Sequence, residues 1–189
     1  MKLALLGSTS VGKTTLGHYL SGQPQPLDYI STIGVDIMYI RLEGNKKITI
    51  YDLAGEDRFK KICESFIMNS DILAFCFNQN DYASFVSSIK RYNECIKLGY
   101  TFQKKIIFIA TKADKSPFEN YTEVIEKQLG ANMVLLTTSS KAQIGRDEVL
   151  DYLESTFPQK LALELHTTEP EEFEVYYKSM FCTEKCIIT

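Results

Sequence analysis

The residues most able to do chemistry lie near the N-terminus, where residues 7–14 read Gly-Ser-Thr-Ser-Val-Gly-Lys-Thr. A glycine, four residues, Gly-Lys and a hydroxyl residue form a pattern typical of loops that bind phosphate groups. Gly7 and Gly12 would let the backbone approach phosphate oxygens closely. Lys13 would reach the terminal phosphates of a nucleotide, and the Thr14 hydroxyl would bind Mg²⁺. The plainer interpretation is an ordinary turn between a strand and a helix that carries a surface lysine.

Two aspartates further along the chain suit other parts of a nucleotide. Asp52 stands at the end of an apolar run, where a carboxylate can hold Mg²⁺, usually through water, and Gly55 follows with an N–H for a terminal phosphate. Asp114 follows another apolar run, and its carboxylate can accept the two hydrogen bonds that a guanine edge donates and adenine does not. Asp114 therefore indicates guanine as the base.

Two more segments support a site for the base. The aliphatic stem of Lys112, within Thr111-Lys-Ala-Asp, can lie across the plane of the base. The segment Thr138-Ser-Ser-Lys141 follows the next apolar run, and its backbone N–H groups can meet the guanine O6. Each segment alone is a common surface turn. Their order and spacing together favour one nucleotide site.

The elements that must position these residues alternate between strand and helix. Gly44-Asn45 separates two strand-like runs and predicts an antiparallel hairpin, whereas each later strand follows a helix and should be parallel. We therefore expect an α/β fold with a six-stranded, mostly parallel sheet, one antiparallel edge strand, helices on both faces, and ligands at the carboxyl ends of the strands. Strands are predicted at 2–6, 35–43, 47–53, 71–77, 104–110 and 132–137, and helices at 13–21, 57–68, 81–97, 118–129 and 144–157.

The composition is that of an ordinary soluble domain, with 44% apolar and 24% charged residues and a net charge of −3. No apolar run reaches membrane-spanning length, and no signal peptide is recognisable. The five cysteines show no metal-type spacing and predict a reducing, cytosolic setting. Residues 166–189 hold five acidic residues and two lysines, whereas the rest is balanced at 19 acidic and 19 basic residues. We expect a domain over 1–165, a flexible acidic tail over 166–189, and no nucleic-acid surface.

The chain resembles the Ras-like small GTPases, and within them most closely the Rab branch. Residues 29–36, Tyr-Ile-Ser-Thr-Ile-Gly-Val-Asp, are similar to the first switch of that branch, and residues 52–59, Asp-Leu-Ala-Gly-Glu-Asp-Arg-Phe, to the second. The resemblance implies the P-loop NTPase fold of small G proteins, GTP or GDP and Mg²⁺ as cofactors, and switch loops that GTP orders and hydrolysis loosens.

The resemblance also implies roles for individual residues. Thr32 would bind Mg²⁺ by its hydroxyl and the γ-phosphate by its amide, and the metal site would comprise Thr14, Thr32 and, through water, Asp52. Glu56, Lys13 and Thr32 would be the catalytic residues. The implied nucleotide-binding residues are Gly7, Ser10, Val11, Gly12, Lys13, Thr14, Thr15, Tyr29, Thr32, Gly55, Thr111, Lys112, Asp114, Ser139, Ser140 and Lys141.

Several positions depart from the pattern of that family. Glu56 stands where a glutamine usually orients the attacking water, and its negative charge opposes phosphoryl transfer, so we expect slow hydrolysis. Thr9 is bulkier than usual and could crowd that water. Gln25 replaces an aromatic residue that packs against guanine, which predicts faster GDP release. Thr111 replaces the usual asparagine, as in Rac-like relatives.

The switches and the C-terminus predict the partners. Effectors would bind residues 33–40, Tyr51 and residues 56–66. Rab effectors read three aromatic positions, which correspond here to Ile37, Tyr51 and Phe66, and two of the usual aromatics are changed. An exchange factor and a GTPase-activating protein are implied. The last four residues, Cys186-Ile-Ile-Thr, resemble a prenylation box, and Cys182 could carry a second lipid. The expected location is cytoplasmic, peripheral on the cytoplasmic face of membranes.

Three functions fit these observations. The first is a Rab-like GTPase switch in membrane and vesicle trafficking that hydrolyses GTP slowly. The second is an interaction module that hardly hydrolyses GTP, stays loaded with it and recruits effectors. The third, a P-loop kinase or ATPase, is disfavoured by Asp114, because its carboxylate suits guanine rather than adenine.

Overall fold

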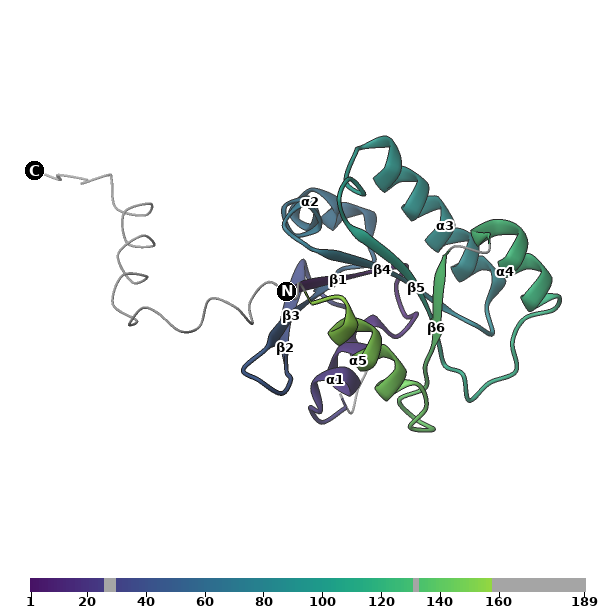
Figure 1. Ribbon diagram of the computed structural model, residues 1–189. Helices are drawn as coiled ribbons and strands as arrows, with labels where there is room; N and C mark the ends of the chain where they lie inside the picture. The colour runs from purple at the N-terminus through teal and green to yellow at the C-terminus, as the bar shows by residue number, and fades with distance from the viewer. Residues whose placement is uncertain (26–29, 131–132, 158–189) are drawn as a thin grey trace, which may run out of the picture. The chain divides into compact units, whose positions relative to one another are not determined.

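A twisted six-stranded sheet forms the centre of the computed structural model, which describes residues 1–25, 30–130 and 133–157 (Figure 1). The strand order is β2-β3-β1-β4-β5-β6, with β2 antiparallel to β3 and all other neighbours parallel. The predicted fold class and the antiparallel edge strand are confirmed. The strands are β1 (Lys2–Leu6), β2 (Val35–Arg41), β3 (Lys47–Leu53), β4 (Ile72–Asn78), β5 (Lys105–Thr111) and β6 (Val134–Thr137).

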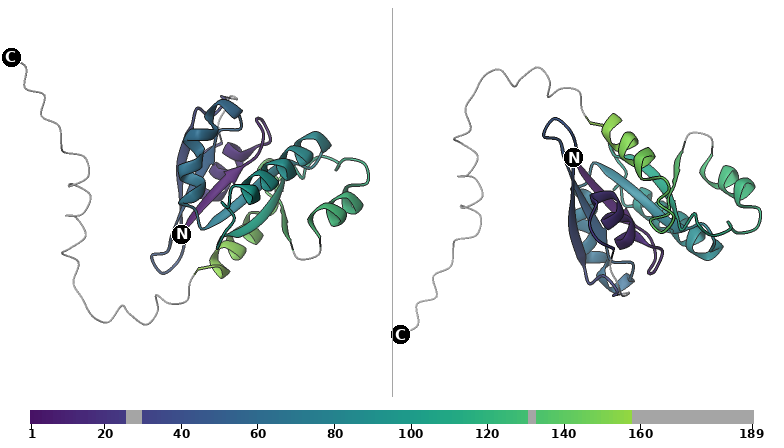
Figure 2. Two further views of the ribbon diagram at one scale, coloured as in Figure 1. Left: turned by 90° about the horizontal axis from the view of Figure 1, so that it is seen from above. Right: turned by 90° about the horizontal axis from the view of Figure 1, so that it is seen from below.

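Helices cover both faces of the sheet, as predicted. Helices α2, α3 and α4 lie on one face, and α1 and α5 lie together on the other, as the views from above and below show (Figure 2). The helices are α1 (Lys13–Ser21), the short 3₁₀ turn η1 (Asp57–Phe59), α2 (Lys60–Met68), α3 (Tyr82–Lys97), α4 (Tyr121–Leu129) and α5 (Arg146–Ser155).

The core lies where the central strands are covered on both faces. Parallel strands in that position need apolar side chains on both sides, so they form continuous apolar runs instead of alternating patterns. Six of the seven residues of β4 are buried. Phe75 stacks on Phe108 of β5, and Phe77 meets Phe85 of α3 edge to face. This packing holds the carboxyl ends of β1, β3, β4 and β5 at one edge, where the predicted chemistry lies.

Element boundaries differ from the prediction where local caps decide them. The expected helix 57–68 is divided into η1 and α2. Asp81 accepts hydrogen bonds from the amides of Ala83 and Ser84, so it caps α3 instead of belonging to it. Gly145 precedes α5 with φ of 76°, which moves the helix start beyond residue 144. Within the described ranges, no helix is long and apolar enough to cross a membrane.

Candidate functional site

The loop after β1 is curled around the side chain of Lys13. Its ammonium donates hydrogen bonds to the carbonyls of Gly7 at 2.9 Å and Ser8 at 2.8 Å, and the residue is only 6% exposed. A Cβ at Gly7 would lie 2.3 Å from the carbonyl oxygen of Cys76, so this position requires glycine. Gly12 takes φ of 99° and starts α1. The buried lysine differs from the surface lysine of an ordinary turn, and the loop directs a helix N-terminus toward its own cavity.

Three oxygen-bearing side chains from separate segments meet beside this loop. The Thr14 hydroxyl lies 2.5 Å from Asp52 Oδ2 and 3.1 Å from the Thr32 hydroxyl, which in turn donates to Asp52 Oδ2 at 3.2 Å. Asp52 is fully buried, and its other carboxylate oxygen, Oδ1, has no hydrogen-bond partner among the residues the structure describes. Burial raises the pKa of Asp52, which the hydrogen bonds from Thr14 and Thr32 oppose.

This arrangement fits Mg²⁺, a cation that prefers oxygen ligands and usually retains several waters. One carboxylate and two hydroxyls suffice for such a site. A cation there would also compensate the orphaned Asp52 oxygen, because an unpaired buried polar atom is costly.

The start of the second predicted switch is pressed against the phosphate loop. A Cβ at Gly55 would lie 2.5 Å from the amide nitrogen of Thr9, so only glycine fits. The amide of Ala54 donates to the carbonyl of Gly34 at 2.9 Å, which joins this segment to the first switch. Thr9 itself is exposed at the mouth of the loop.

Glu56 is engaged by two side chains that sequence reasoning did not select. The Ser31 hydroxyl donates to Glu56 Oε1 at 3.0 Å, and the Arg58 guanidinium pairs with Glu56 Oε2 at 2.8 Å. Both residues lie within the two switch-like segments. Nothing local marks Ser31 as a partner of Glu56, because the two residues are 25 positions apart.

A cavity of about 660 Å³ opens between these segments. Its volume falls within the range of small-molecule sites, roughly 300–1,000 Å³. The phosphate loop forms one wall and the first switch the other, and Gly55 and Lys112 complete it. The lining residues are Thr9, Ser10, Gly12, Lys13, Thr14, Thr15, Ile30, Ser31, Thr32, Ile33, Val35, Asp36, Gly55 and Lys112.

The segments predicted to recognise the base meet at the ends of β5 and β6. The Thr111 hydroxyl lies 2.5 Å from the carbonyl of Val11 and 2.9 Å from that of Phe77, so it ties β5 to the phosphate loop and to β4. Lys112 donates to the carbonyl of Ser10 at 2.9 Å. Thr111, which replaces the usual asparagine of the family, thus joins β4, β5 and the phosphate loop through hydrogen bonds.

Asp114 is exposed and oriented by the following segment. Ser139 is buried and its hydroxyl donates to Asp114 Oδ1 at 2.7 Å. This hydrogen bond lowers the pKa of Asp114. Ser139 is held by an antiparallel bridge to Ile144, while half-buried Ser140 and exposed Lys141 lie in the turn of residues 140–143 between them. Tyr29, Cys182 and Cys186 lie outside the described residues, and Gln25 is exposed.

The three predicted effector positions lie together. Ile37 on β2 is directly opposite Tyr51 on β3 in the sheet register. The Tyr51 ring meets the Phe66 ring of α2 edge to face at 5.0 Å. Ile37 is 43% exposed, and Ile33 of the first switch segment and Ile62 of α2 are 78% and 53% exposed. An apolar surface of this kind on the switch segments suits protein partners.

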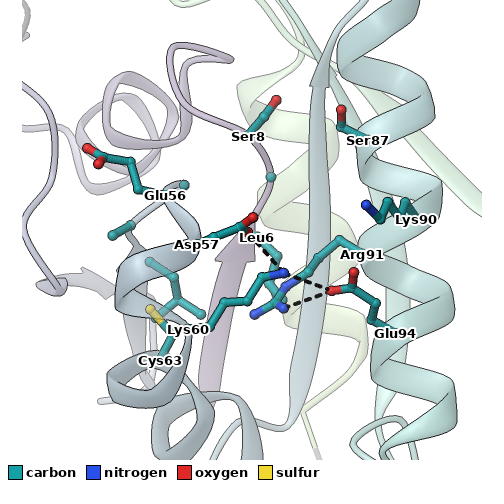
Figure 3. Close-up of a pocket in the computed structure, with 14 residues that line it drawn as sticks. Leu6, Ser8, Glu56, Asp57, Lys60, Cys63, Ser87, Lys90, Arg91 and Glu94 are labelled. Atoms are coloured by element: carbon teal, nitrogen blue, oxygen red, sulfur yellow. Dashed lines mark hydrogen bonds and ion pairs between the residues drawn. The ribbon is translucent and has the colours of Figure 1, made fainter.

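A second cavity, of about 330 Å³, lies between α2 and α3 and was not predicted from the sequence. Lys60 pairs with Asp57 at 2.9 Å and with Glu94 at 3.4 Å, and Arg91 pairs with the same Glu94 oxygen at 3.2 Å (Figure 3). These pairs connect the second switch to α3. Figure 3 also shows Glu56 pointing away from this cluster.

Comparison with known proteins agrees with this geometry. The family model described as Ras family matches residues 2–160. Ras-related protein Rab-1C of Dictyostelium discoideum is 30% identical over 169 residues, covering 85% of this chain and 84% of that protein. Ras-related protein RAB1BV of Beta vulgaris is 27% identical over 168 residues, covering 86% and 78%. GTP-binding protein YPT1 of Saccharomyces cerevisiae is 39% identical over 87 residues, 42% of its length.

The chain therefore belongs to the Ras family of small GTPases, and it is similar to the Rab and Ypt proteins within that family. The resemblance inferred from the switch-like segments is confirmed. The roles of individual residues, the rate of hydrolysis and the lipid remain predictions.

Proposed function

We propose that this protein is a Rab-like molecular switch that binds Mg²⁺·GTP, hydrolyses it slowly to GDP, and recruits effectors at a membrane. The observation that carries the proposal is the convergence of Lys13, the Thr14–Thr32–Asp52 oxygens and Asp114 at one edge of the sheet. In this proposal Lys13 holds the phosphates, the three oxygen-bearing side chains hold Mg²⁺, and Asp114 recognises guanine.

The chemistry is an in-line attack of water on the γ-phosphorus, in which the bond to the β–γ bridging oxygen breaks. Lys13 would neutralise charge on the transferred group, and the amides of Thr32 and Gly55 would hold the γ-phosphate. Mg²⁺, when bound by Thr14, Thr32 and the Asp52 shell, supplies further positive charge at the phosphate oxygens. An activating protein would supply an arginine in trans.

Slow hydrolysis is proposed because Glu56 is poorly suited to assist that water. A carboxylate cannot donate a hydrogen bond to the transition state, and it places negative charge beside the γ-phosphate. Both of its oxygens are already engaged, by Ser31 and Arg58. We expect an intrinsic rate at or below about 10⁻⁴ s⁻¹, the order of unassisted family members.

Single-turnover hydrolysis by the wild type and by Glu56→Gln tests this explanation. The glutamine variant is expected to be faster, because an amide can donate a hydrogen bond and carries no charge. Glu64→Gln, a change of the same chemistry in α2, serves as the control and is expected to match the wild type. A Glu56→Gln rate no higher than that of the wild type contradicts the explanation.

The alternative, a module that stays loaded with GTP, is favoured by the same engagement of Glu56. It is separated from the switch by the nucleotide that remains with the purified protein, identified by chromatography. Mostly GDP supports a working switch, and mostly GTP supports the module. Tighter binding of ATP than of GTP would contradict both and favour a P-loop kinase or ATPase.

Partner and membrane binding complete the proposal. The exposed Ile33, Ile37 and Ile62 provide apolar area for effectors within the predicted effector-binding ranges, residues 33–40 and 56–66, and an exchange factor would act on the same face. The domain is proposed to span 1–165, with 166–189 as a tail that brings the protein to the cytoplasmic face of membranes through a lipid on Cys186 and a second lipid on Cys182. Intact mass after eukaryotic expression tests the anchor, and no added isoprenoid at Cys186 would refute it.

A further inference from the structure

The carboxylate of Glu56 joins the two switch segments. Its Oε1 accepts a hydrogen bond from the Ser31 hydroxyl at 3.0 Å, and its Oε2 pairs with the Arg58 guanidinium at 2.8 Å. Each oxygen therefore has one donor, one from the first segment and one from the second. The Glu56 side chain is 32% exposed, so the contact is partly shielded from water.

The Ser31 contact has direct consequences for the nucleotide cavity. Ser31 precedes Thr32, whose hydroxyl reaches Thr14 and Asp52. Ser31 and Thr32 line one wall of the cavity, and Gly55, the neighbour of Glu56, also lines it. A tie between Ser31 and Glu56 therefore connects two segments that line the cavity, beside the residues predicted to hold Mg²⁺.

The two contacts differ in strength. A hydrogen bond to a carboxylate is stronger than one to a neutral group, because the acceptor carries charge. Arg58 is 68% exposed, and an exposed ion pair contributes little. Arg58 also lies over the Phe59 ring, with 4.8 Å between its guanidinium carbon and the ring centre, which fixes its direction. The hydrogen bond from Ser31 should therefore contribute more than the ion pair with Arg58 to holding the Glu56 side chain in place.

We propose that Ser31 and Arg58 are positioning residues for Glu56, and that the three form a latch which joins the switch loops and slows nucleotide release. In the family a glutamine at this position usually orients the attacking water. Here Glu56 instead holds the two switch loops together through the Ser31–Glu56–Arg58 latch. The inference rests on the proposed function, because it requires a guanine nucleotide in the cavity. The latch would slow nucleotide release in addition to the contacts that the protein makes with the phosphates, the metal and the base.

The test is the dissociation rate of a fluorescent, non-hydrolysable GTP analogue in excess Mg²⁺, which hydrolysis cannot influence. Ser31→Ala removes only the hydroxyl and is expected to speed release about 10-fold, as the loss of a charge-assisted hydrogen bond predicts. Ser31→Thr keeps the hydroxyl and is expected to restore the wild-type rate within about threefold. Arg58→Ala is expected to give an increase of about threefold or less.

A matched control and a double variant separate the latch from a general loosening. Ser87→Ala on α3 removes a hydroxyl that donates only to Ala83 of the same helix, and it is expected to change nothing. In a Glu56→Ala background, Ser31→Ala is expected to have no further effect, because its partner is gone.

Two results would overturn the latch. One is release from Ser31→Ala at the wild-type rate, and the other is an equal increase with and without Glu56. If the wild-type protein fails to bind the analogue at all, the proposed function fails together with the latch, whereas normal binding with an unchanged Ser31→Ala rate refutes the latch alone.

Discussion

Asp52 shows most directly how a single residue depends on what it binds. Its carboxylate is fully buried, and one of its oxygens has no partner among the described residues. Such an atom is unfavourable unless a cation or an ordered water meets it. The Asp52 carboxylate is therefore preorganised for a ligand, and its unpaired oxygen lowers the stability of the protein when no ligand is bound.

Removal of divalent cations is therefore expected to accelerate GDP release, by about tenfold or more. The reason is that the phosphates lose their counter-charge while Asp52 faces them unneutralised. Release of fluorescent GDP in excess EDTA, compared with release in excess Mg²⁺, measures the effect. Equal rates in the two buffers would contradict a metal site formed by Thr14, Thr32 and Asp52.

Asp114 is the residue proposed to select the base. Asp114→Ala is expected to weaken GTP binding roughly 10- to 100-fold, as the loss of hydrogen bonds to a charged group predicts. ATP binding should change little, because adenine lacks the donor pair. Since the Ser139 hydrogen bond lowers the Asp114 pKa, the carboxylate stays ionised even somewhat below its usual pKa, and this preference should not vary between about pH 5 and 8. Competition titration measures both affinities.

At the scale of elements, glycines decide how closely loops approach one another. Gly145 caps α5 with a positive φ, and a Cβ there would lie 1.9 Å from the carbonyl oxygen of Thr137 at the end of β6. Gly99 has a similar φ of 73°, but a Cβ there would meet nothing within 4 Å. A comparison of substitutions at these two positions therefore separates the effect of backbone strain from that of a steric collision.

Gly145→Ala is expected to lower the free energy of unfolding by about 3 kcal/mol or more, because it adds a collision to the strain. Gly99→Ala carries the strain alone and should cost about 1 kcal/mol. Urea unfolding of both variants measures the difference. A Gly145→Ala loss equal to that of Gly99→Ala would mean that the β6–α5 connection shifts without cost.

Gly55 makes the same kind of contact between the second switch and the phosphate loop. Gly55→Ala would force the switch away from Thr9, because its Cβ would lie 2.5 Å from the Thr9 amide nitrogen. We expect about a tenfold or greater loss of affinity for a GTP analogue and a change of at most about threefold for GDP, which has no γ-phosphate for Gly55 to contact. Titration with both nucleotides tests the difference, and equal losses would contradict it.

At the scale of the whole molecule, the sheet and its covering helices are complete within Met1–Thr156, which form one compact unit. A chain that ends at residue 165 is therefore expected to keep the melting temperature within about 2 °C and the GDP affinity within about threefold, because no element of the sheet is removed. Thermal unfolding and GDP titration of both chains measure this. A markedly lower melting temperature would show that residues 166–189 stabilise the domain.

The sequence by itself determined the order of elements, because apolar periodicity and turn residues act over short distances. It also determined the position of the phosphate loop, the two aspartates and Thr138–Lys141, since each lies at or just beyond the carboxyl end of a strand and parallel strands end at the same edge of a sheet. The predicted sheet topology was correct for that reason. The starts of α2, α3, α4 and α5 were less accurate, by one to three residues. A 3₁₀ turn precedes α2, the Asp81 side chain caps α3, and residues with positive φ, Asn120 and Gly145, precede α4 and α5.

Only the tertiary structure decided which side chains meet across loops. Ser31 and Glu56 are 25 residues apart, and no local pattern indicates that one would hold the other. The buried position of Lys13, the role of Thr111 in joining β4, β5 and the phosphate loop, and the ion pairs between α2 and α3 belong to the same category. Residue type and spacing encode what a side chain can do, whereas the packing of distant segments decides which partner it reaches.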